Sequence, residues 1–370
     1  MPDKSARKVV RQAKRIVVKV GTNAICSPDG GVDRRSVRRL AKQISDVKDR
    51  GVRVTLVASG AIGTGVGELG LSGRPKDMPK LQAAAAVGQG QLMRTFHDVF
   101  AKLGLMVAQV LLTRDDFEDR TRYLNIRNTL RALDEWNVVG IVNENDTIAV
   151  DEIRFGENDM LAAMVTNMLG ADLLVFLTAV EGLMGDQGVL DVIETVDAEV
   201  MSLVTDDSTS LGVGGMSSKL EAARAVTKAG EVAVIASYGE PNVLTRLLDG
   251  ERIGTIFLPA RRKMTQRQRW IGQATRPAGK IMIDNGAVAA LAKRGKSLLP
   301  SGVAGVSGKF AKGAVVVVVD SAGTQIARGL TNYSSEQLGR IKRLKTSQIA
   351  KVLGDKPYDE VIHRNNMLVG

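Results

Sequence analysis

Two lysines stand beside glycine-containing segments in this sequence, an arrangement suited to binding phosphate. Lys19 is followed by Val20-Gly21-Thr22, and Lys219 ends the run GVGGMSSK that starts at Gly212. Glycines let main-chain amides approach an anion, and a helix start adds free amides and a positive dipole end. The second run differs in spacing from a Walker A loop. Read alone, each segment also fits a plain surface turn with a solvated lysine.

Three further polar segments complete the candidate chemistry. The segment SGAIG at 59–63 offers main-chain amides to a carboxylate or a phosphate. The segments NEND at 143–146 and GEND at 156–159 offer oxygens for an ammonium group and carboxylates to orient lysines. Turn formation and helix capping are the structural alternatives for both. Brought together, these groups suit phosphoryl transfer, which depends on positioning and charge neutralisation.

The segments between these clusters alternate between apolar runs and amphipathic stretches. We expect strands at 15–20, 52–58, 106–112, 138–142, 173–177 and 232–236, and helices at 36–50, 80–100, 121–136, 159–170 and 217–229. Such alternation predicts an α/β fold, a mainly parallel sheet sandwiched by helices. Ligands of such sheets bind beyond the carboxyl ends of the strands, where the polar clusters fall.

The charge is divided unevenly along the chain. Residues 1–260 carry 31 Lys and Arg against 34 Asp and Glu, whereas residues 261–370 carry 20 against 6. We therefore expect a basic, solvated N-terminal extension at 1–15, a first domain at 16–260, a linker at 261–276, a small mixed β-barrel domain at 277–353 and a tail at 354–370. The basic second domain is the part to suspect of meeting phosphate-rich partners.

Composition excludes several classes of protein. One cysteine, Cys26, cannot form a disulfide within the chain and suits a reducing, cytoplasmic location. No apolar run approaches the ~20 residues of a membrane span, so no membrane partner is expected. The two histidines, His97 and His363, show no metal-ligand spacing.

These motifs together resemble the glutamate 5-kinases, a branch of the amino acid kinase family. The matching segments are VKVGT at 18–22, SGAI at 59–62, LQAAAAVGQGQ at 81–91, LLTR at 111–114, YLNIRNTL at 123–130, NEND at 143–146 and GGMSSK at 214–219. Residues 277–353 resemble a PUA domain, a module often associated with RNA. The resemblance covers nearly the whole chain.

The resemblance implies ATP- and Mg²⁺-dependent phosphorylation of the γ-carboxylate of L-glutamate, the first step of proline biosynthesis. It implies that Lys19 and Lys219 bracket the phosphoryl group and that Asp159 holds both lysines. It assigns glutamate binding to Ser59, Gly60, Ala61, Asp146 and Asn158, and nucleotide binding to Lys19, Thr178, Ala179, Val213, Gly214, Gly215, Met216, Ser217, Ser218 and Lys219. It assigns no residue to the metal. Members of the family are usually oligomeric and often inhibited by proline.

The sequence departs from the family pattern on the nucleotide side. Ala179 stands where the family has Asp, Val213 stands where it has Thr, and the segment MGDQG at 184–188 is shorter than usual. Two alternatives therefore accompany the kinase hypothesis. One is another acyl-phosphate-forming kinase of a different amino acid, and the other is a non-catalytic homologue with an RNA-binding or regulatory role.

Overall fold

The computed structural model of the chain describes residues 2–27, 31–149, 158–204, 215–274 and 277–369. The chain forms two compact units, Met1–Lys263 and Met264–Gly370. Each unit has its own sheet and its own hydrophobic core. None of the helices described is long and apolar enough to cross a membrane.

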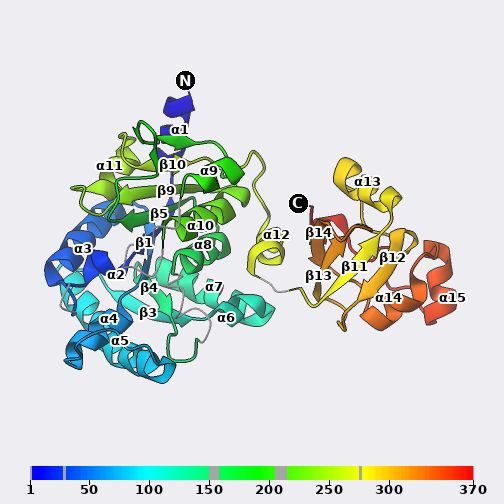
Figure 1. Ribbon diagram of the computed structural model, residues 1–370, viewed down its shortest axis with the longest axis horizontal. Helices are drawn as coiled ribbons and strands as arrows, with labels where there is room; N and C mark the ends of the chain where they lie inside the picture. The colour runs from blue at the N-terminus through cyan, green and yellow to red at the C-terminus, as the bar shows by residue number, and fades with distance from the viewer. Residues whose placement is uncertain (1, 28–30, 150–157, 205–214, 275–276, 370) are drawn as a thin grey trace. The chain divides into compact units, whose positions relative to one another are not determined.

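The first unit is built on a sheet of eight strands in the order β3-β4-β2-β1-β5-β9-β10-β8 (Figure 1). These strands are β1 (Arg15–Val20), β2 (Arg53–Ala58), β3 (Val107–Leu112), β4 (Val139–Glu144), β5 (Leu173–Thr178), β8 (Val192–Ile193), β9 (Val232–Ser237) and β10 (Thr255–Phe257). From β3 to β9 all neighbours are parallel, whereas β10 runs antiparallel to β9. The expected mainly parallel sheet is confirmed, and six of its strands share one carboxyl edge.

Helices cover both faces of this sheet (Figure 1). One face carries α3 (Arg34–Asp49), α5 (Met78–Ala101) and α11 (Val243–Asp249), and the other carries α7 (Arg120–Glu135), α8 (Asn158–Leu169) and α10 (Met216–Lys228). The shorter elements are α2 (Thr22–Ile25), α4 (Ala61–Glu68), α6 (Arg114–Glu118), α9 (Ala198–Ser202) and the hairpin of β6 (Met184–Gly185) and β7 (Gly188–Val189).

Strand β1 shows how the sheet aims a charged side chain. Its β-branched residues Ile16, Val18 and Val20 are buried in the core beneath α3. Because successive side chains of a strand point to opposite faces, Lys19 points to the face covered by α8 and α10. The apolar run that forms the strand therefore also directs the lysine toward those helices.

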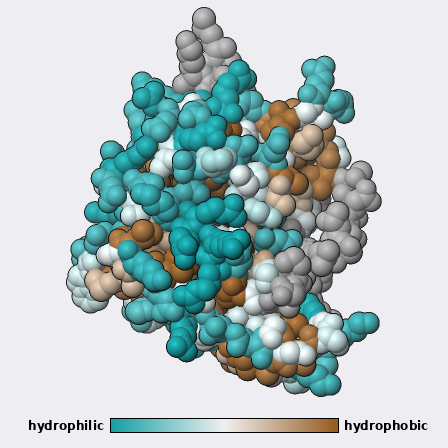
Figure 2. Space-filling model, turned by 90° about the vertical axis from the view of Figure 1, so that its left-hand side faces the viewer, coloured by the Kyte–Doolittle hydropathy of each residue, from teal (hydrophilic) through white to brown (hydrophobic). Residues whose placement is uncertain are grey.

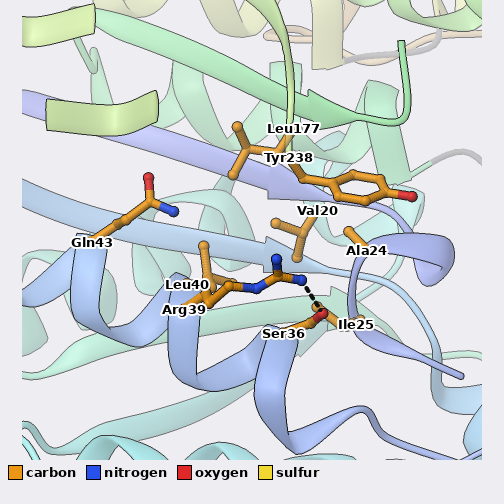
Figure 3. Close-up of a pocket in the computed structure, with 9 residues that line it drawn as sticks. All are labelled: Val20, Ala24, Ile25, Ser36, Arg39, Leu40, Gln43, Leu177 and Tyr238. Atoms are coloured by element: carbon orange, nitrogen blue, oxygen red, sulfur yellow. Dashed lines mark hydrogen bonds between the residues drawn. The ribbon is translucent and has the colours of Figure 1, made fainter. Parts of the chain in front are cut away.

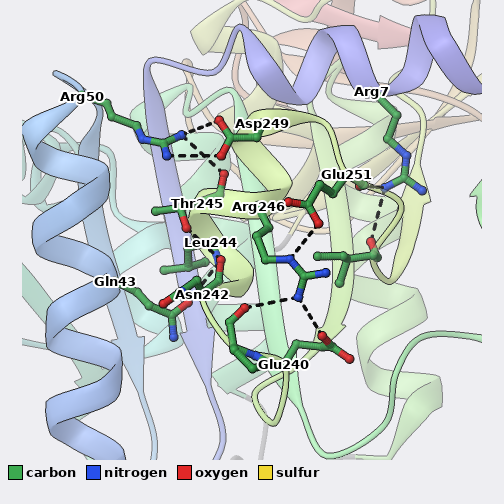
Figure 4. A network of polar contacts seen from close by, with 12 residues as sticks. Arg7, Gln43, Arg50, Glu240, Asn242, Leu244, Thr245, Arg246, Asp249 and Glu251 are labelled. Atoms are coloured by element: carbon green, nitrogen blue, oxygen red, sulfur yellow. Dashed lines mark hydrogen bonds and ion pairs between the residues drawn. The ribbon is translucent and has the colours of Figure 1, made fainter.

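The N-terminal segment differs from the solvated extension that we expected. Residues Pro2–Arg11 form helix α1, and Val10 is buried in the core of the first unit. The Arg7 guanidinium donates a hydrogen bond of 2.8 Å to the main-chain oxygen of Glu251 (Figure 4). It also pairs with the Asp191 carboxylate. The expectation was wrong because it considered only the basic residues of this segment. Val10 packs in the core, and Arg7 donates hydrogen bonds to main-chain carbonyl groups.

Gly88 allows α5 to approach α4 closely, and Gly60 forms the turn that leads into α4. A Cβ atom on Gly88 would lie 1.9 Å from the main-chain oxygen of Ala61, so no other residue fits there without a shift. Gly60 precedes α4 with a φ of 110°, a left-handed conformation that favours glycine. These glycines place the start of α4 and the neighbouring residues of α5 against the carboxyl edge of the sheet.

The second unit is a five-stranded mixed sheet in the order β12-β11-β13-β14-β15 with helices around it. Its elements are α12 (Gln266–Arg269), β11 (Gly279–Ile283), α13 (Asn285–Arg294), β12 (Val303–Ser307), β13 (Val315–Val319), β14 (Gln325–Leu330), α14 (Ser335–Ile341), α15 (Ile349–Leu353) and β15 (Met367–Val369). Strand β15 pairs with β14, so residues expected to form a tail complete this sheet.

Candidate active site

The first unit buries an ion triad at the carboxyl edge of its sheet. Asp159, in the first turn of α8, has no solvent-exposed surface. Its carboxylate lies 2.6 Å from Lys19 Nζ, at the end of β1, and 3.1 Å from Lys219 Nζ, in the first turn of α10. The structure thus brings together the three residues that the sequence singled out for phosphoryl transfer.

Within the triad, one carboxylate faces two ammonium groups. Burial alone would raise the pKa of Asp159, but the two lysines and the Ser218 hydroxyl together lower it, so the carboxylate is ionised. Burial lowers the pKa of Lys219, and Asp159 partly offsets that effect. Among the described residues, these three groups carry two positive charges and one negative charge in a buried site. Such a site favours an anionic ligand that completes the neutralisation.

The start of α10 supports the triad. Gly215 is the N-cap residue, and the Ser218 hydroxyl donates to Asp159 Oδ2 at 2.8 Å. Met216 and Ser217 fill the first helical turn beside it. A helix start with free amides and an adjacent lysine is a physical anion site. Val213 and Gly214, which we also predicted to bind nucleotide, lie outside the described residues.

A second polar network lies next to the triad along the chain. The side-chain nitrogen of Asn158 donates to Ser59 Oγ at 2.9 Å and to the main-chain oxygen of Ala58 at 3.1 Å. The buried Asn158 Oδ1 has no hydrogen-bond partner among the described residues. A buried acceptor without a donor is costly, so this oxygen suits a ligand that brings one.

Asp146 lies beyond β4 in a loop on the same edge. Burial raises its pKa to about 6, and the Arg74 guanidinium opposes this shift. The loop is tied down by hydrogen bonds from Asn145 N to the Leu112 oxygen at 2.8 Å and from Gln82 Nε2 to the Ala149 oxygen at 3.3 Å. Asp146 is therefore a partly desolvated carboxylate on a fastened loop.

Two of the three departures from the family pattern, Ala179 and the segment at 184–188, follow the end of β5, and the third, Val213, lies outside the described residues. Thr178 closes the strand, and its carbonyl accepts a hydrogen bond from Tyr238 N at 2.8 Å. Ala179 follows and is exposed. The segment at 184–188 lies in the β6–β7 hairpin, in which Met184 and Gly185 pair with Val189 and Gly188. Thr178 and Ala179 therefore lie at the carboxyl edge of the sheet, beside β1.

A separate pocket opens on the other face of the sheet (Figure 3). Val20 and Leu177, which pair across β1 and β5, point into it, whereas their neighbour Lys19 points to the triad. The guanidinium of Arg39 at this pocket already donates to Ser36 Oγ at 2.9 Å. The pocket is therefore distinct from the candidate active site.

The described side chains include no cluster of three or more His, Cys, Asp or Glu residues placed to hold a metal ion. The Asp159 carboxylate is engaged by two lysines and a serine. Mg²⁺ is often bound by substrate phosphates with few protein ligands, and the site fits that mode.

The buried lysines, the anion-binding helix start and the parallel sheet define a small-molecule kinase. The chain belongs to the amino acid kinase family, whose model matches residues 14–237, and a PUA domain model matches residues 279–353.

Curated relatives match the chain over nearly its whole length. A glutamate 5-kinase from Moorella thermoacetica is 45% identical over 100% of both chains. One from Syntrophus aciditrophicus is 42% identical over 99% of this chain and 97% of the relative. Among solved structures, carbamate kinase from Giardia lamblia bound to AMP-PNP matches at 20% identity with a TM-score of 0.48, covering 68% of this chain and 100% of that one.

Sequence reasoning missed part of the polar network. In the sequence, Asn143 stands out only as a member of a polar cluster, and Gln89 only as part of a segment that resembles the family. The structure joins them by a hydrogen bond of 2.8 Å from Asn143 Nδ2 to Gln89 Oε1. A polar residue in the alanine-rich run of α5, directly after the close-packed Gly88, was the available signal.

Proposed function

We propose that the chain is a glutamate 5-kinase, which transfers the γ-phosphoryl group of ATP to the γ-carboxylate of L-glutamate. The product is L-glutamyl 5-phosphate, the first intermediate of proline biosynthesis. One observation carries the proposal. Asn158 and Asp159 are consecutive residues at the start of α8. Asn158 belongs to the polar network and has a side-chain oxygen without a hydrogen-bond partner among the described residues, and Asp159 binds Lys19 and Lys219. The full-length relatives support the same reaction.

The chemistry requires charge neutralisation more than proton transfer. A γ-carboxylate is already ionised at neutral pH, so no general base is needed. The obstacle is repulsion between that carboxylate and the phosphates of ATP. Lys19 and Lys219, with Mg²⁺ carried on the phosphates, neutralise the transferring group, and Asp159 keeps the two ammonium groups apart and oriented.

The acceptor side favours a free amino acid. Asn158 Oδ1 and the Asp146 carboxylate are both acceptors, and an ammonium group is the donor that matches them. An N-acetylated substrate brings one neutral N–H and an apolar methyl group, so it leaves a carboxylate unpaired. The two acceptors therefore favour glutamate over N-acetylated substrates.

A substrate panel tests the function. We expect the purified chain to release ADP from MgATP when L-glutamate is present, with much lower kcat/KM for L-aspartate and N-acetyl-L-glutamate. Preference for another amino acid would favour the alternative acyl-phosphate kinase. Absence of turnover with every acceptor, in a folded protein, would favour the non-catalytic alternative.

The pH dependence of glutamate binding follows from Asp146. Its ionised form pairs with the ammonium group, and a pKa of about 6 means that this form is lost as the pH falls through 6. KM for glutamate should therefore rise roughly tenfold per pH unit below 6, while KM for ATP changes little. Asp146→Asn should have a high KM without this slope. A native KM that stays flat between pH 7 and 5 would remove Asp146 from the ammonium site.

Ala179 offers a test of the nucleotide side. An aspartate at this strand end could accept a hydrogen bond from the nucleotide, and alanine cannot. Ala179→Asp should lower KM for ATP by roughly 2- to 13-fold, the range for one net hydrogen bond, and leave KM for glutamate nearly unchanged. Weaker ATP binding in this variant would mean that the pocket is organised around alanine and the short β6–β7 hairpin.

We also propose that the chain forms a homo-oligomer. Leu69, Leu71 and Val87, on or beside α4 and α5, expose large hydrophobic side chains, and hydrophobic residues gather along the lower edge of this side of the molecule (Figure 2). A second copy of the chain would bury them. Light scattering of the purified protein should then give a mass above the 39.5 kDa of one chain, and a monomeric mass would contradict the assignment.

Two further properties belong to the same proposal. Proline, an amino acid with a carboxylate and an ammonium group, should inhibit by competing for the glutamate site, which initial rates at varied glutamate can test. The basic second unit, with its PUA match, should bind RNA weakly, with affinity that falls steeply as salt increases. Salt-independent or undetectable binding would make its charge a solvated surface. The reaction and the single cysteine fit a cytoplasmic enzyme.

A further inference from the structure

Three side-chain amides, those of Gln89, Asn143 and Asn158, form a continuous chain of hydrogen bonds. Gln89, on α5, accepts from Asn143 Nδ2 at 2.8 Å, and Asn143 Oδ1 accepts from Asn158 Nδ2 at 2.9 Å. Asn143 and Asn158 are buried, with 2% and 7% of their surfaces exposed. In such an environment, a reversed amide would place two donors or two acceptors face to face.

Two main-chain groups fix the direction of this chain. The Glu144 N–H donates to Asn143 Oδ1 at 2.9 Å, so that atom must be the oxygen. The Ala58 carbonyl accepts from Asn158 Nδ2, so that atom must be the nitrogen. Main-chain groups cannot exchange donor for acceptor. It follows that Asn143 must donate to Gln89 and that Asn158 must hold its oxygen away from the network, where it has no partner among the described residues.

We propose that Gln89 is a positioning residue for the ammonium group of the acceptor substrate. Its oxygen holds the Asn143 amide, which in turn holds Asn158 with Oδ1 free to accept from that ammonium. Gly88 places Gln89 by the close approach of α5 to α4. The proposal rests on the proposed glutamate kinase activity, and it adds a residue that touches neither substrate nor nucleotide.

Only the oxygen of Gln89 is used in the network, because its buried Nε2 has no hydrogen-bond partner among the described residues. Two substitutions with side chains of similar length therefore test whether the oxygen of Gln89 is required. Gln89→Met removes the acceptor and leaves the Asn143 amide donor unpaired. Gln89→Glu keeps an acceptor oxygen, whether or not the carboxyl group is ionised. Gln91→Met, two residues further along the same helix, is the matched control.

The experiment compares glutamate with glutarate, which has both carboxylates but no ammonium group. For Gln89→Met we expect KM for glutamate to rise roughly tenfold or more, the scale for an unsatisfied buried donor. The inhibition constant of glutarate and KM for ATP should change less than about twofold. Gln89→Glu and Gln91→Met should keep KM for glutamate within about threefold of the native value.

A parallel rise of the glutarate constant in Gln89→Met would overturn the proposal, since it would indicate general damage to the site. An equal loss in Gln89→Glu would also overturn it, and this variant remains decisive if Gln89→Met does not fold. Assay of the native chain shows whether the proposed function or only the proposed role of Gln89 has failed. If it releases no ADP with glutamate, the proposed function fails; if it does and the pattern above is absent, only the role of Gln89 fails.

Discussion

Replacing Lys219 or Lys19 by alanine should lower kcat by roughly 10²-fold or more, the loss seen when one transition-state donor is removed. Each ammonium group is buried and held by Asp159, at 3.1 Å and 2.6 Å, so its position needs no reorganisation during the reaction. In the proposed reaction, these ammonium groups face the charge that develops on the transferring phosphoryl group. KM for glutamate should change much less than kcat.

The control for this prediction lies on the same helix. Lys228, in the last turn of α10, is exposed, and Lys228→Ala should leave kcat within about twofold. Steady-state rates at saturating ATP and glutamate provide the comparison. Turnover of Lys219→Ala or Lys19→Ala close to that of Lys228→Ala would exclude the corresponding lysine from the mechanism.

Replacing Asp159 by asparagine should cost both activity and stability. The change removes the carboxylate that faces two buried ammonium groups, and breaking a buried ion pair in this way costs about 3–5 kcal/mol of unfolding free energy. In the variant, a folded-state lysine pKa falls below its unfolded value, so the unfolded chain binds more protons. Stability should then rise with pH, and the deficit should be smaller at pH 9.5 than at pH 7.

Urea unfolding of the native chain and the variant at both pH values measures this effect. The double variant with Asp159→Asn and Lys219→Met should recover part of the stability, because one of the two stranded charges is gone, yet it should remain inactive. A single variant that is as stable as the native chain at pH 7 would contradict the view that Asp159 is the counter-ion of both lysines.

Much of the first unit was predictable because its strands are strong local patterns. The β-branched run at 15–20 and the apolar run at 173–177 became β1 and β5 with ends that moved by at most one residue. The helices at 80–100 and 121–136 likewise began and ended within two residues of expectation. The N-terminal helix could not be predicted in this way, because it is held by packing and by the hydrogen bonds of Arg7. These contacts join residues that are far apart in the sequence.

Some residues of the candidate site could likewise be predicted from the sequence, and others could not. Lys19 and Lys219 were visible because glycines and strand ends mark phosphate sites. The polar relay was not, because its members are distant in sequence: Gln89 and Asn143 are 54 positions apart, and Asn143 and Asn158 are 15 apart. The direction of that relay depends on two main-chain groups, and no spacing rule encodes them.

The most direct test of the central claim follows one oxygen atom. Glutamate labelled with ¹⁸O in both oxygens of its γ-carboxylate is incubated with MgATP and the purified chain. In the proposed reaction a carboxylate oxygen attacks the γ-phosphorus, and ADP leaves. The amine of the product then closes a five-membered ring at the γ-carbonyl carbon and expels phosphate with that oxygen attached. We expect inorganic phosphate with one ¹⁸O atom, formed in step with ADP. Glutamate-dependent ADP release that yields only unlabelled phosphate would mean that water, and not the γ-carboxylate, receives the phosphoryl group.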